Sequence, residues 1–289
     1  MTRWLVTGAG GQLGRDAVSA LGDRDVVALT RAELDLADPA AVHDAVLAFR
    51  PDVILNTGAY TAVDAAEIDE ARAHAVNAVG PRALAESAER LGSVLIQVST
   101  DYVFAGDADR PYPEDAPTAP RSAYGRTKAA GERAVLETSA RAYVVRTAWV
   151  YGAGGANFVK TMVRLERERS RVSVVADQRG SPTWSWQLAQ GLVALGELRP
   201  DPGIYHCTNA GETSWHGLAR AVFEELGADP DRVDATTTAA FPRPAPRPAY
   251  SVLAATRWQA AGLAPMPPWR AALSRAFATV GEQLGVGEA

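Results

Sequence analysis

The chain has 289 residues, enough to bury one large core or a main domain with a smaller partner. Its formal net charge of -5 argues against nucleic acid or an anionic membrane as a partner, because both usually recruit a basic stripe. Cys207 is the only cysteine, which excludes an intrachain disulfide and a cysteine-rich metal site and favours a reducing, cytoplasmic setting.

The first residues, MTRWLVTGAGG, lack the long apolar stretch and small-residue cleavage site of a signal peptide. No later apolar run has the length of a membrane span. We therefore expect a soluble, unprocessed protein that acts on small molecules.

Short apolar runs alternate with longer Ala-rich segments of helical periodicity through the first half of the chain. The apolar runs predict strands at 4–8, 26–30, 52–58, 93–100 and 142–152. The segments between them predict helices at 11–22, 38–50, 70–92 and 122–140, the second with Asp38 as N-cap and Pro39 in its first turn. Because alternating β and α units need crossover connections, we predict a doubly wound parallel sheet with helices on both faces.

The pattern changes after about residue 152. Helices are expected near 155–168, 185–198 and 214–226, with Pro-rich loops such as FPRPAPRPAY (241–250) between elements. We predict that 1–152 form a dinucleotide-binding domain, that part of 160–210 returns to its sheet, and that 153–289 are mainly a smaller lobe over the carboxyl edge of the sheet.

A glycine-rich turn joins the first predicted strand to the first helix. Gly8, Gly11 and Gly14 have the spacing GxxGxxG. Glycines at this place let the backbone turn sharply and approach a pyrophosphate held at a helix N-terminus. The turn therefore predicts a dinucleotide site, and the alternative is a Gly-rich turn with no ligand.

The second predicted strand ends at Thr30 and Arg31, where an NAD-selective protein usually has a carboxylate for the ribose 2′-hydroxyl. Arg31 can accommodate a 2′-phosphate, and Asp35 and Leu36 would follow near the adenine. The pattern favours NADPH over NADH, with a solvated surface arginine as the alternative.

Tyr124 and Lys128 are four residues apart and would share one face of a helix. A neighbouring ammonium lowers a phenol pKa, which would suit Tyr124 to general acid catalysis. The strand predicted at 93–100 delivers the Thr100 hydroxyl to the carboxyl edge, where open α/β sheets bind ligands. The alternatives are an exposed helix pair and a threonine that caps local backbone.

These residues resemble the extended short-chain dehydrogenase/reductases, which act largely on nucleotide sugars. Over nearly the whole chain, the sequence resembles more narrowly the dTDP-4-dehydrorhamnose reductase family. The matching segments, in order, are GAYTAVDAAE, VNAVGPRALAESAE, STDYVFAG, AYGRTKAAGE, RTAWVYGAGGANFVKTM, DQRGSPT, GIYHCTNAGETSW and RPAYSVL.

The resemblance implies a Rossmann-like doubly wound fold, a smaller C-terminal substrate-binding lobe, and NADPH- or NADH-dependent reduction of the C4 keto group of a dTDP-4-keto-6-deoxy sugar. Tyr124 would donate the proton, Thr100 would share the oxyanion, and Lys128 would tune Tyr124 and hold the nicotinamide ribose. The cofactor residues implied are Gly8, Gly11, Gln12, Leu13, Gly14, Arg31, Asp35, Leu36, Ala59, Tyr60, Tyr124 and Lys128. The substrate residues implied are Val63, Asp101, Tyr102, Trp149, Asn157 and Arg247.

Three of the substrate assignments have plain structural alternatives. Arg247 is expected at the substrate diphosphate because a planar guanidinium binds phosphate bidentately, but it can equally be a loop charge. Trp149 can belong to the core, and Asn157 can cap the helix that begins NFVKTM.

The chain departs from the family pattern at two positions. Trp186 stands where an acidic residue would take part in metal-bridged dimerisation, so the chain is expected as a monomer or a homodimer without that bridge. Ala254 replaces the usual Asp, which removes a possible helix cap. No metal is expected, since His43, His74, His206 and His216 do not form a metal-spaced cluster.

Rival functions use the same fold. A nucleotide-sugar dehydratase needs a Glu after the Asp, where this chain has Tyr102. An epimerase is less favoured, and a noncatalytic regulatory subunit of methionine adenosyltransferase is disfavoured by intact Thr100, Tyr124 and Lys128. Within the reductases, the rhamnose precursor and a dihydrostreptose-type precursor both stay open.

Overall fold

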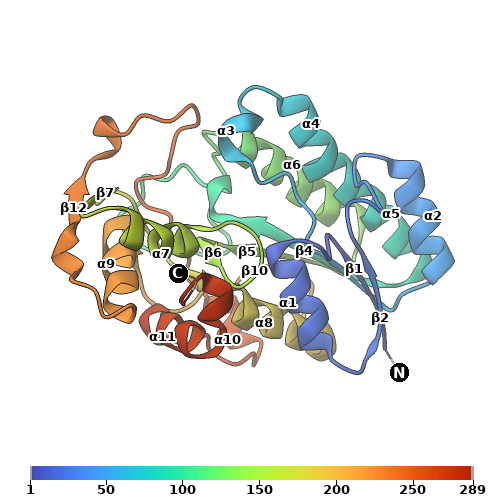
Figure 1. The fold of residues 1–289 in the computed structure, drawn as a ribbon. Coiled ribbons are helices and arrows are strands. Elements are labelled where there is room, and N and C mark those ends of the chain that lie inside the picture. Colours follow the sequence, from blue (N-terminus) through green and yellow to red (C-terminus); the bar gives the residue numbers. More distant parts are fainter. Residues whose placement is uncertain (1, 288–289) are drawn as a thin grey trace.

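The computed structural model describes residues 2–287 and has a six-stranded sheet at its centre (Figure 1). Its strands are β1 (Arg3–Thr7), β2 (Asp25–Leu29), β3 (Val53–Asn56), β4 (Val94–Thr100), β5 (Ala142–Thr147) and β10 (Gly203–His206). Their order is β10-β5-β4-β3-β1-β2, and all neighbouring pairs are parallel. The connection from β2 to β3 passes back across β1, so the strand order reverses between β1 and β3, where such sheets bind ligands.

Helices cover both faces of this sheet, as predicted (Figure 1). One face is covered by α1 (Gln12–Leu21) and α8 (Ser185–Leu198), and the other by α2 (Pro39–Phe49), α5 (Gly80–Leu91) and α6 (Ala123–Thr138). Side chains alternate along a strand, so Trp4 and Val6 enter the first core while Leu5 enters the second. All three are fully buried, which explains why the strand is apolar at consecutive positions.

A second, smaller lobe lies over the carboxyl side of the sheet. Its core is built by α7 (Phe158–Glu168), α9 (Trp215–Glu225) and α11 (Trp269–Val280) against the parallel pair β7 (Val172–Val175) and β12 (Val233–Thr236). Short strands complete it: β6 (Val150–Tyr151), β8 (Arg179–Gly180), β9 (Thr183–Trp184) and β11 (Thr213–Ser214). Helix α10 (Thr256–Ala260) instead packs beside β10, with Trp258 in the core of the central sheet. Since α8 and β10 join the central sheet, the chain crosses between the lobes more than once, and the functional division at 152 stays a prediction.

Two expected elements are interrupted in the structure. The strand expected at 142–152 stops at Thr147 and resumes as β6, because Trp149 has φ +48°, a left-handed conformation that a strand does not contain. The helix expected at 70–92 consists of α4 (Glu70–His74), a π-helical turn at Ala75–Val79, and α5. Both interruptions lie beside the site described below.

Helix starts follow the expected cap chemistry. The Asp38 carboxylate accepts from the amides of Ala40 and Ala41, with Pro39 in the first turn of α2. Ser122 caps α6 by accepting from the amide of Gly125, which starts the helix just before Tyr124. Among residues 2–287, no helix combines the length and apolar character needed to cross a membrane.

Candidate active site

A cleft of about 870 Å³ runs along the carboxyl ends of β1, β3, β4 and β5. The predicted residues that line it are Gly8, Gly11, Gln12, Leu13, Arg31, Asp35, Leu36, Ala59, Tyr60, Val63, Thr100, Asp101, Tyr102, Tyr124, Lys128 and Trp149. They come from separate parts of the chain, and the parallel sheet brings them to one edge. The cleft coincides with the reversal in strand order.

The glycine-rich turn has the shape that a dinucleotide pyrophosphate needs. Gly8 has φ +71°, and a Cβ there would lie 2.5 Å from the Cα of Gly58. A Cβ on Gly14 would lie 2.2 Å from the carbonyl oxygen of Gly8, so only glycine lets α1 approach β1 this closely. Gly14 therefore acts in packing and does not line the cleft.

The N-terminus of α1 also offers free donors. Gly11 is its N-cap and supplies no side-chain hydrogen bond, and the first turn contains no acidic residue. The first backbone N–H groups of a helix lack intrahelical acceptors, and together with the helix dipole they favour an anion. These residues thus fit the pyrophosphate of a dinucleotide.

Arg31 lies at the far end of the cleft, beyond the carboxyl end of β2, together with Thr30 and Asp35. Asp35 is held by an ion pair with Arg72 at 2.7 Å, and its pKa is lowered chiefly by the backbone amide of Ala37 and by Arg72. No ion pair involves Arg31 among the described residues. Its position fits contact with a phosphate on the adenosine ribose.

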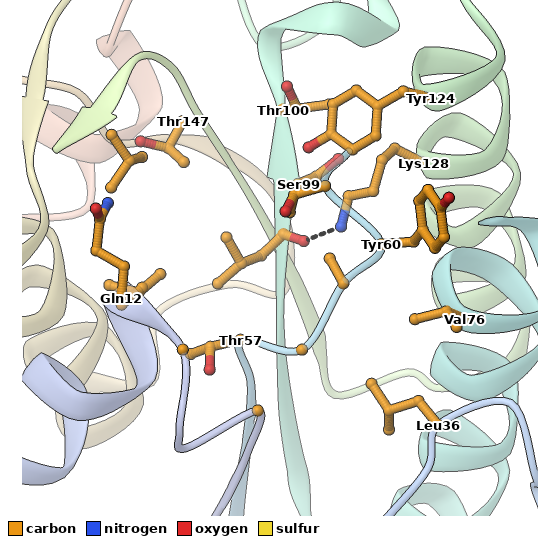
Figure 2. Close-up of a pocket in the computed structure, with 18 of the residues that line it drawn as sticks. Gln12, Leu36, Thr57, Tyr60, Val76, Ser99, Thr100, Tyr124, Lys128 and Thr147 are labelled. Atoms are coloured by element: carbon orange, nitrogen blue, oxygen red, sulfur yellow. Dashed lines mark hydrogen bonds between the residues drawn. The ribbon is translucent and has the colours of Figure 1, made fainter. Parts of the chain in front are cut away.

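The π-helical turn explains how the loop after β3 reaches the cleft. It places the buried Asn77 so that its side-chain oxygen accepts from the amide of Tyr60 at 2.8 Å, while its nitrogen donates to the carbonyl of Tyr60 and to Thr127. Tyr60 therefore lies against α6 below Lys128 (Figure 2). Turns of this kind recur at functional sites.

Thr100 and Tyr124 lie close together at the end of β4 (Figure 2). Asp101 follows Thr100 directly in the chain and lines the same cleft. The Thr100 hydroxyl donates to the Asp101 carboxylate at 2.9 Å and accepts from the amide of Tyr102. Burial raises the pKa of Asp101 to about 6. Burial also raises the pKa of Tyr124 to about 12, against a smaller lowering by a hydrogen bond with Thr100.

The pKa of Tyr124 corrects one expectation. A lowering by Lys128 was expected, but burial dominates and the net shift is upward. Lys128 instead donates from Nζ to the backbone carbonyl of Val98 at 2.6 Å. Burial lowers the Lys128 pKa to about 8, so its charge is retained at neutral pH.

Two tryptophans build the wall of the cleft that belongs to the second lobe. The rings of Trp149 and Trp215 stack with centroids 3.6 Å apart. Gly180 lies directly against the Trp149 ring, where a Cβ would come within 2.4 Å of the indole. Trp149 thus lies at the cleft, as expected, and the sequence reasoning missed Trp215 although it closes the matching segment GETSW.

Two predicted substrate residues lie off the cleft lining. Asn157 caps α7 by accepting from the amide of Lys160, and its nitrogen donates to Gln12 and to the carbonyl of Gly152. This confirms the helix-cap alternative, although the bond to Gln12 keeps it next to the phosphate turn. Arg247 pairs with Asp64 at 2.9 Å and lines a small separate hollow with Tyr102.

Several further lining residues were not anticipated. They are Gly10, Thr30, Ala32, Leu34, Thr57, Gly58, Thr61, Val76, Val98, Ser99, Thr147, Ala148, Val150, Ala156 and Trp215. Most of them are adjacent in sequence to predicted residues, in the loops that follow the strands. Including the whole of each such loop would have identified them. Thr147 lines this cleft, and its hydroxyl is buried without a hydrogen-bond partner.

No group of three His, Cys, Asp or Glu side chains able to hold a metal ion exists within residues 2–287. His206 is buried beside Arg146, and burial together with that charge lowers its pKa to about 3. Cys207 is buried and free.

Comparison with known proteins identifies the family. Residues 2–281 match the family model described as RmlD substrate binding domain. The chain is 55% identical over 282 residues to dTDP-4-dehydrorhamnose reductase of Streptomyces griseus, a match that covers 95% of this chain and 93% of that protein. The chain belongs to the dTDP-4-dehydrorhamnose reductase family.

Other members of the dTDP-4-dehydrorhamnose reductase family agree in sequence and in structure. A probable dTDP-4,6-dihydroxy-2-methyloxan-3-one 4-ketoreductase of Streptomyces antibioticus is 54% identical over 280 residues, covering 95% of this chain and 94% of that protein. The crystal structure of the Bacillus anthracis dTDP-4-dehydrorhamnose reductase in complex with NADP has a TM-score of 0.93 at 38% identity, covering 96% of this chain and 99% of that one. The family resemblance and the fold class are confirmed.

Proposed function

We propose that the protein reduces the C4 keto group of dTDP-4-dehydro-L-rhamnose to give dTDP-L-rhamnose, with NADPH or NADH as the reductant. One observation carries the proposal. A phosphate-binding turn and the group Thr100, Tyr124 and Lys128 lie in the same cleft, at the point where a doubly wound sheet binds ligands. A family of keto-sugar reductases shares the sequence over almost its whole length.

In a carbonyl reduction, different residues of the cleft supply the proton and stabilise the carbonyl oxygen. When bound, the reduced nicotinamide supplies the hydride. Tyr124 keeps its phenolic proton at neutral pH because its pKa is about 12, and it gives that proton to the substrate carbonyl oxygen. Thr100 donates a hydrogen bond to the same oxygen after its hydroxyl proton turns away from the Asp101 carboxylate. Positioned proton transfer of this kind contributes roughly 10²- to 10⁴-fold in rate.

Lys128 and the phosphate turn hold the reductant. The Lys128 ammonium has further donors beside the one used by Val98, and it reaches a ribose hydroxyl while its positive charge stabilises the developing phenolate. Gly8, Gly11, Gln12 and Leu13 would hold the pyrophosphate of the cofactor, and Arg31 would bind a 2′-phosphate. This arrangement supports NADPH over NADH.

The substrate occupies the side of the cleft formed by the second lobe. Val63, Asp101, Tyr102 and Trp149 line that part, and Trp215 supports the Trp149 ring. Arg247 binds the diphosphate after exchanging its bond to Asp64 for a phosphate oxygen. We assign residues 1–152 mainly to the cofactor and 153–289 mainly to the substrate.

A second candidate is the reduction of another dTDP-4-keto-6-deoxy sugar, including a dihydrostreptose-type precursor. The Streptomyces antibioticus relative, whose name describes a different keto sugar, is nearly as similar to this chain as the Streptomyces griseus reductase. Both candidates are reactions of a cytoplasmic enzyme that acts as a monomer or a homodimer on a small nucleotide sugar, without nucleic acid or a membrane.

The decisive assay mixes the purified protein with dTDP-4-dehydro-L-rhamnose and NADPH or NADH, and follows the absorbance of the reduced nicotinamide. Cofactor oxidation with formation of dTDP-L-rhamnose supports the proposal. Oxidation only with a different dTDP-keto sugar favours the second candidate. Tight cofactor binding without any turnover would overturn both and favour a noncatalytic regulatory role.

A further inference from the structure

Helix α6 and strand β4 are joined by two hydrogen bonds, one helical turn apart. Lys128 Nζ donates to the carbonyl of Val98 at 2.6 Å, and the Ser99 hydroxyl donates to Glu132 Oε1 at 2.5 Å. Lys128 and Glu132 are four residues apart on one helix face, and Val98 and Ser99 are consecutive on the strand. We call these four residues the strand–helix clamp.

The Ser99–Glu132 half of the clamp is buried, and the charge of Glu132 is neutralised by an arginine. Ser99 and Glu132 are 3% and 4% exposed. Arg146, on the neighbouring strand β5, pairs with Glu132 through Nη2 at 2.7 Å and through Nε at 2.9 Å. Arg146 therefore neutralises the Glu132 charge without help from Ser99. The hydrogen bond from Ser99 to Glu132 thus serves mainly to fix the position of β4 against α6.

That geometric effect falls on the reacting groups. Thr100 follows Ser99 directly at the end of β4, and Tyr124 precedes Lys128 by one turn at the start of α6 (Figure 2). The distance between the Thr100 hydroxyl and the Tyr124 phenol therefore depends on how β4 and α6 lie against each other. Lys128 is also expected to bind the cofactor, so its bond to Val98 can change during the reaction. The Ser99–Glu132 bond is the part of the clamp that keeps the same partners throughout.

We propose that Ser99 and Glu132 are positioning residues, which hold Thr100 and Tyr124 at the separation that proton transfer requires. This inference rests on the proposed reductase function. A displacement of about 1 Å at a reacting group can lower a rate by up to roughly 100-fold. Loss of one of the two clamp bonds should give a smaller effect, on the order of 10-fold in kcat.

The test variant is Ser99→Ala, which removes the hydroxyl and leaves the bonds between Arg146 and Glu132 in place. The matched control is Ser93→Ala. Ser93 is also buried, donates a bond of 2.6 Å to the carbonyl of Pro51, and lies just before β4 at the end of the strand away from the cleft. Both variants lose one buried serine hydrogen bond, but only Ser99 touches α6.

For wild type and both variants we would measure kcat, the KM for NADPH and for dTDP-4-dehydro-L-rhamnose, the melting temperature, and the isotope effect with NADPH deuterated at the transferred position. Ser99→Ala should lower kcat about 10-fold with both KM values within about twofold, and it should raise the isotope effect, because a mispositioned acid makes the chemical step slower. Ser93→Ala should lower the melting temperature with kcat unchanged.

Two results would overturn the inference. The first is an unchanged kcat and isotope effect in Ser99→Ala, and the second is an equal loss of kcat in both variants, which would indicate general destabilisation. Absence of turnover by the wild-type protein is distinct from both. It overturns the proposed function itself, and the catalytic role of the clamp with it.

Discussion

Lys128 donates a hydrogen bond from Nζ to the backbone carbonyl of Val98 and is almost entirely buried. No acidic side chain is in hydrogen-bonding contact with this ammonium within residues 2–287, so a backbone carbonyl is its main anchor. Burial lowers the pKa of the Lys128 ammonium to about 8, against a smaller raising by the Glu132 carboxylate one turn away. The charge of Lys128 is consequently sensitive to pH in a range that is easily measured.

The first prediction concerns cofactor affinity as a function of pH. The free protein holds Lys128 protonated below about pH 8. In the proposed function, the charged ammonium binds the ribose of the cofactor. Raising the pH from 7 to 9 should therefore weaken NADPH binding by up to about tenfold, because neutral Lys128 must first take up a proton. Fluorescence titration with NADPH measures this, and Lys128→Met should bind weakly with a flat pH dependence. An equally steep dependence in Lys128→Met would contradict the assignment.

The second prediction concerns the proton donor. Tyr124→Phe removes the phenolic proton and should lower kcat by roughly 10²- to 10⁴-fold, while the dissociation constant of NADPH stays within a few fold. Stopped-flow or steady-state absorbance of the reduced nicotinamide is the measurement. Tyr205→Phe is the control, since its hydroxyl donates to the carbonyl of Asp201 at the opposite end of the sheet. Comparable activity of the two variants would exclude Tyr124 as the donor.

The third prediction concerns stability and Asp101. Its pKa in the folded protein is raised to about 6 from 3.8, so the folded state binds the proton more tightly than the unfolded state. The destabilisation from ionised Asp101 is present in full above about pH 6 and diminishes as the pH falls towards 4. Asp101→Asn removes the destabilisation by the ionised carboxylate. Relative to wild type, the unfolding free energy of the variant should therefore rise by up to about 3 kcal/mol between pH 4 and pH 8. Urea unfolding at several pH values tests this, and a constant difference would refute it.

The fourth prediction concerns Arg247. A hydrogen bond between charged groups contributes about 1.5–3 kcal/mol, so Arg247→Ala should raise the KM for the dTDP-sugar by roughly 10- to 100-fold with kcat much less affected. Arg243→Ala is a matched control in the same loop, because its guanidinium lies over the Phe241 ring, 4.7 Å from the centroid. Equal KM values for wild type and Arg247→Ala would remove Arg247 from the diphosphate site.

Local sequence patterns were sufficient to predict five of the six strands of the central sheet, whereas β10 was expected only as some part of 160–210. Strand β1, for example, is apolar at Trp4, Leu5 and Val6 because both faces of the sheet are covered. The helices between the strands are periodic because each has one buried face. Spacing was also sufficient to predict a tight glycine turn after β1 and to place Tyr124 and Lys128 on one helix face, and the structure brings both to the cleft. Glycines needed for close backbone approach and residues one turn apart are constraints within a few residues of chain.

The second lobe was predictable only in part. The helices expected near 155–168 and 214–226 are present in it as α7 and α9, but the helix expected near 185–198 is α8, which covers a face of the central sheet. Its two-residue strands, such as β8 and β11, carry no periodic signal, and they form because segments distant in sequence meet. The left-handed Trp149 is likewise a tertiary effect, since the indole is held between Gly180 and Trp215.

By itself, the sequence determined the fold class, the cofactor turn and the chemistry-bearing side chains, because these depend on local periodicity, on glycine geometry and on residue type. Only the tertiary structure decided the partners and the electrostatics of those side chains. It paired Arg247 with Asp64, turned Asn157 into a helix cap bonded to Gln12, and raised the Tyr124 pKa where a lowering was expected. The physical reason is that burial and long-range pairing set the free energy of a charge, and both arise only when separate segments of the chain pack together.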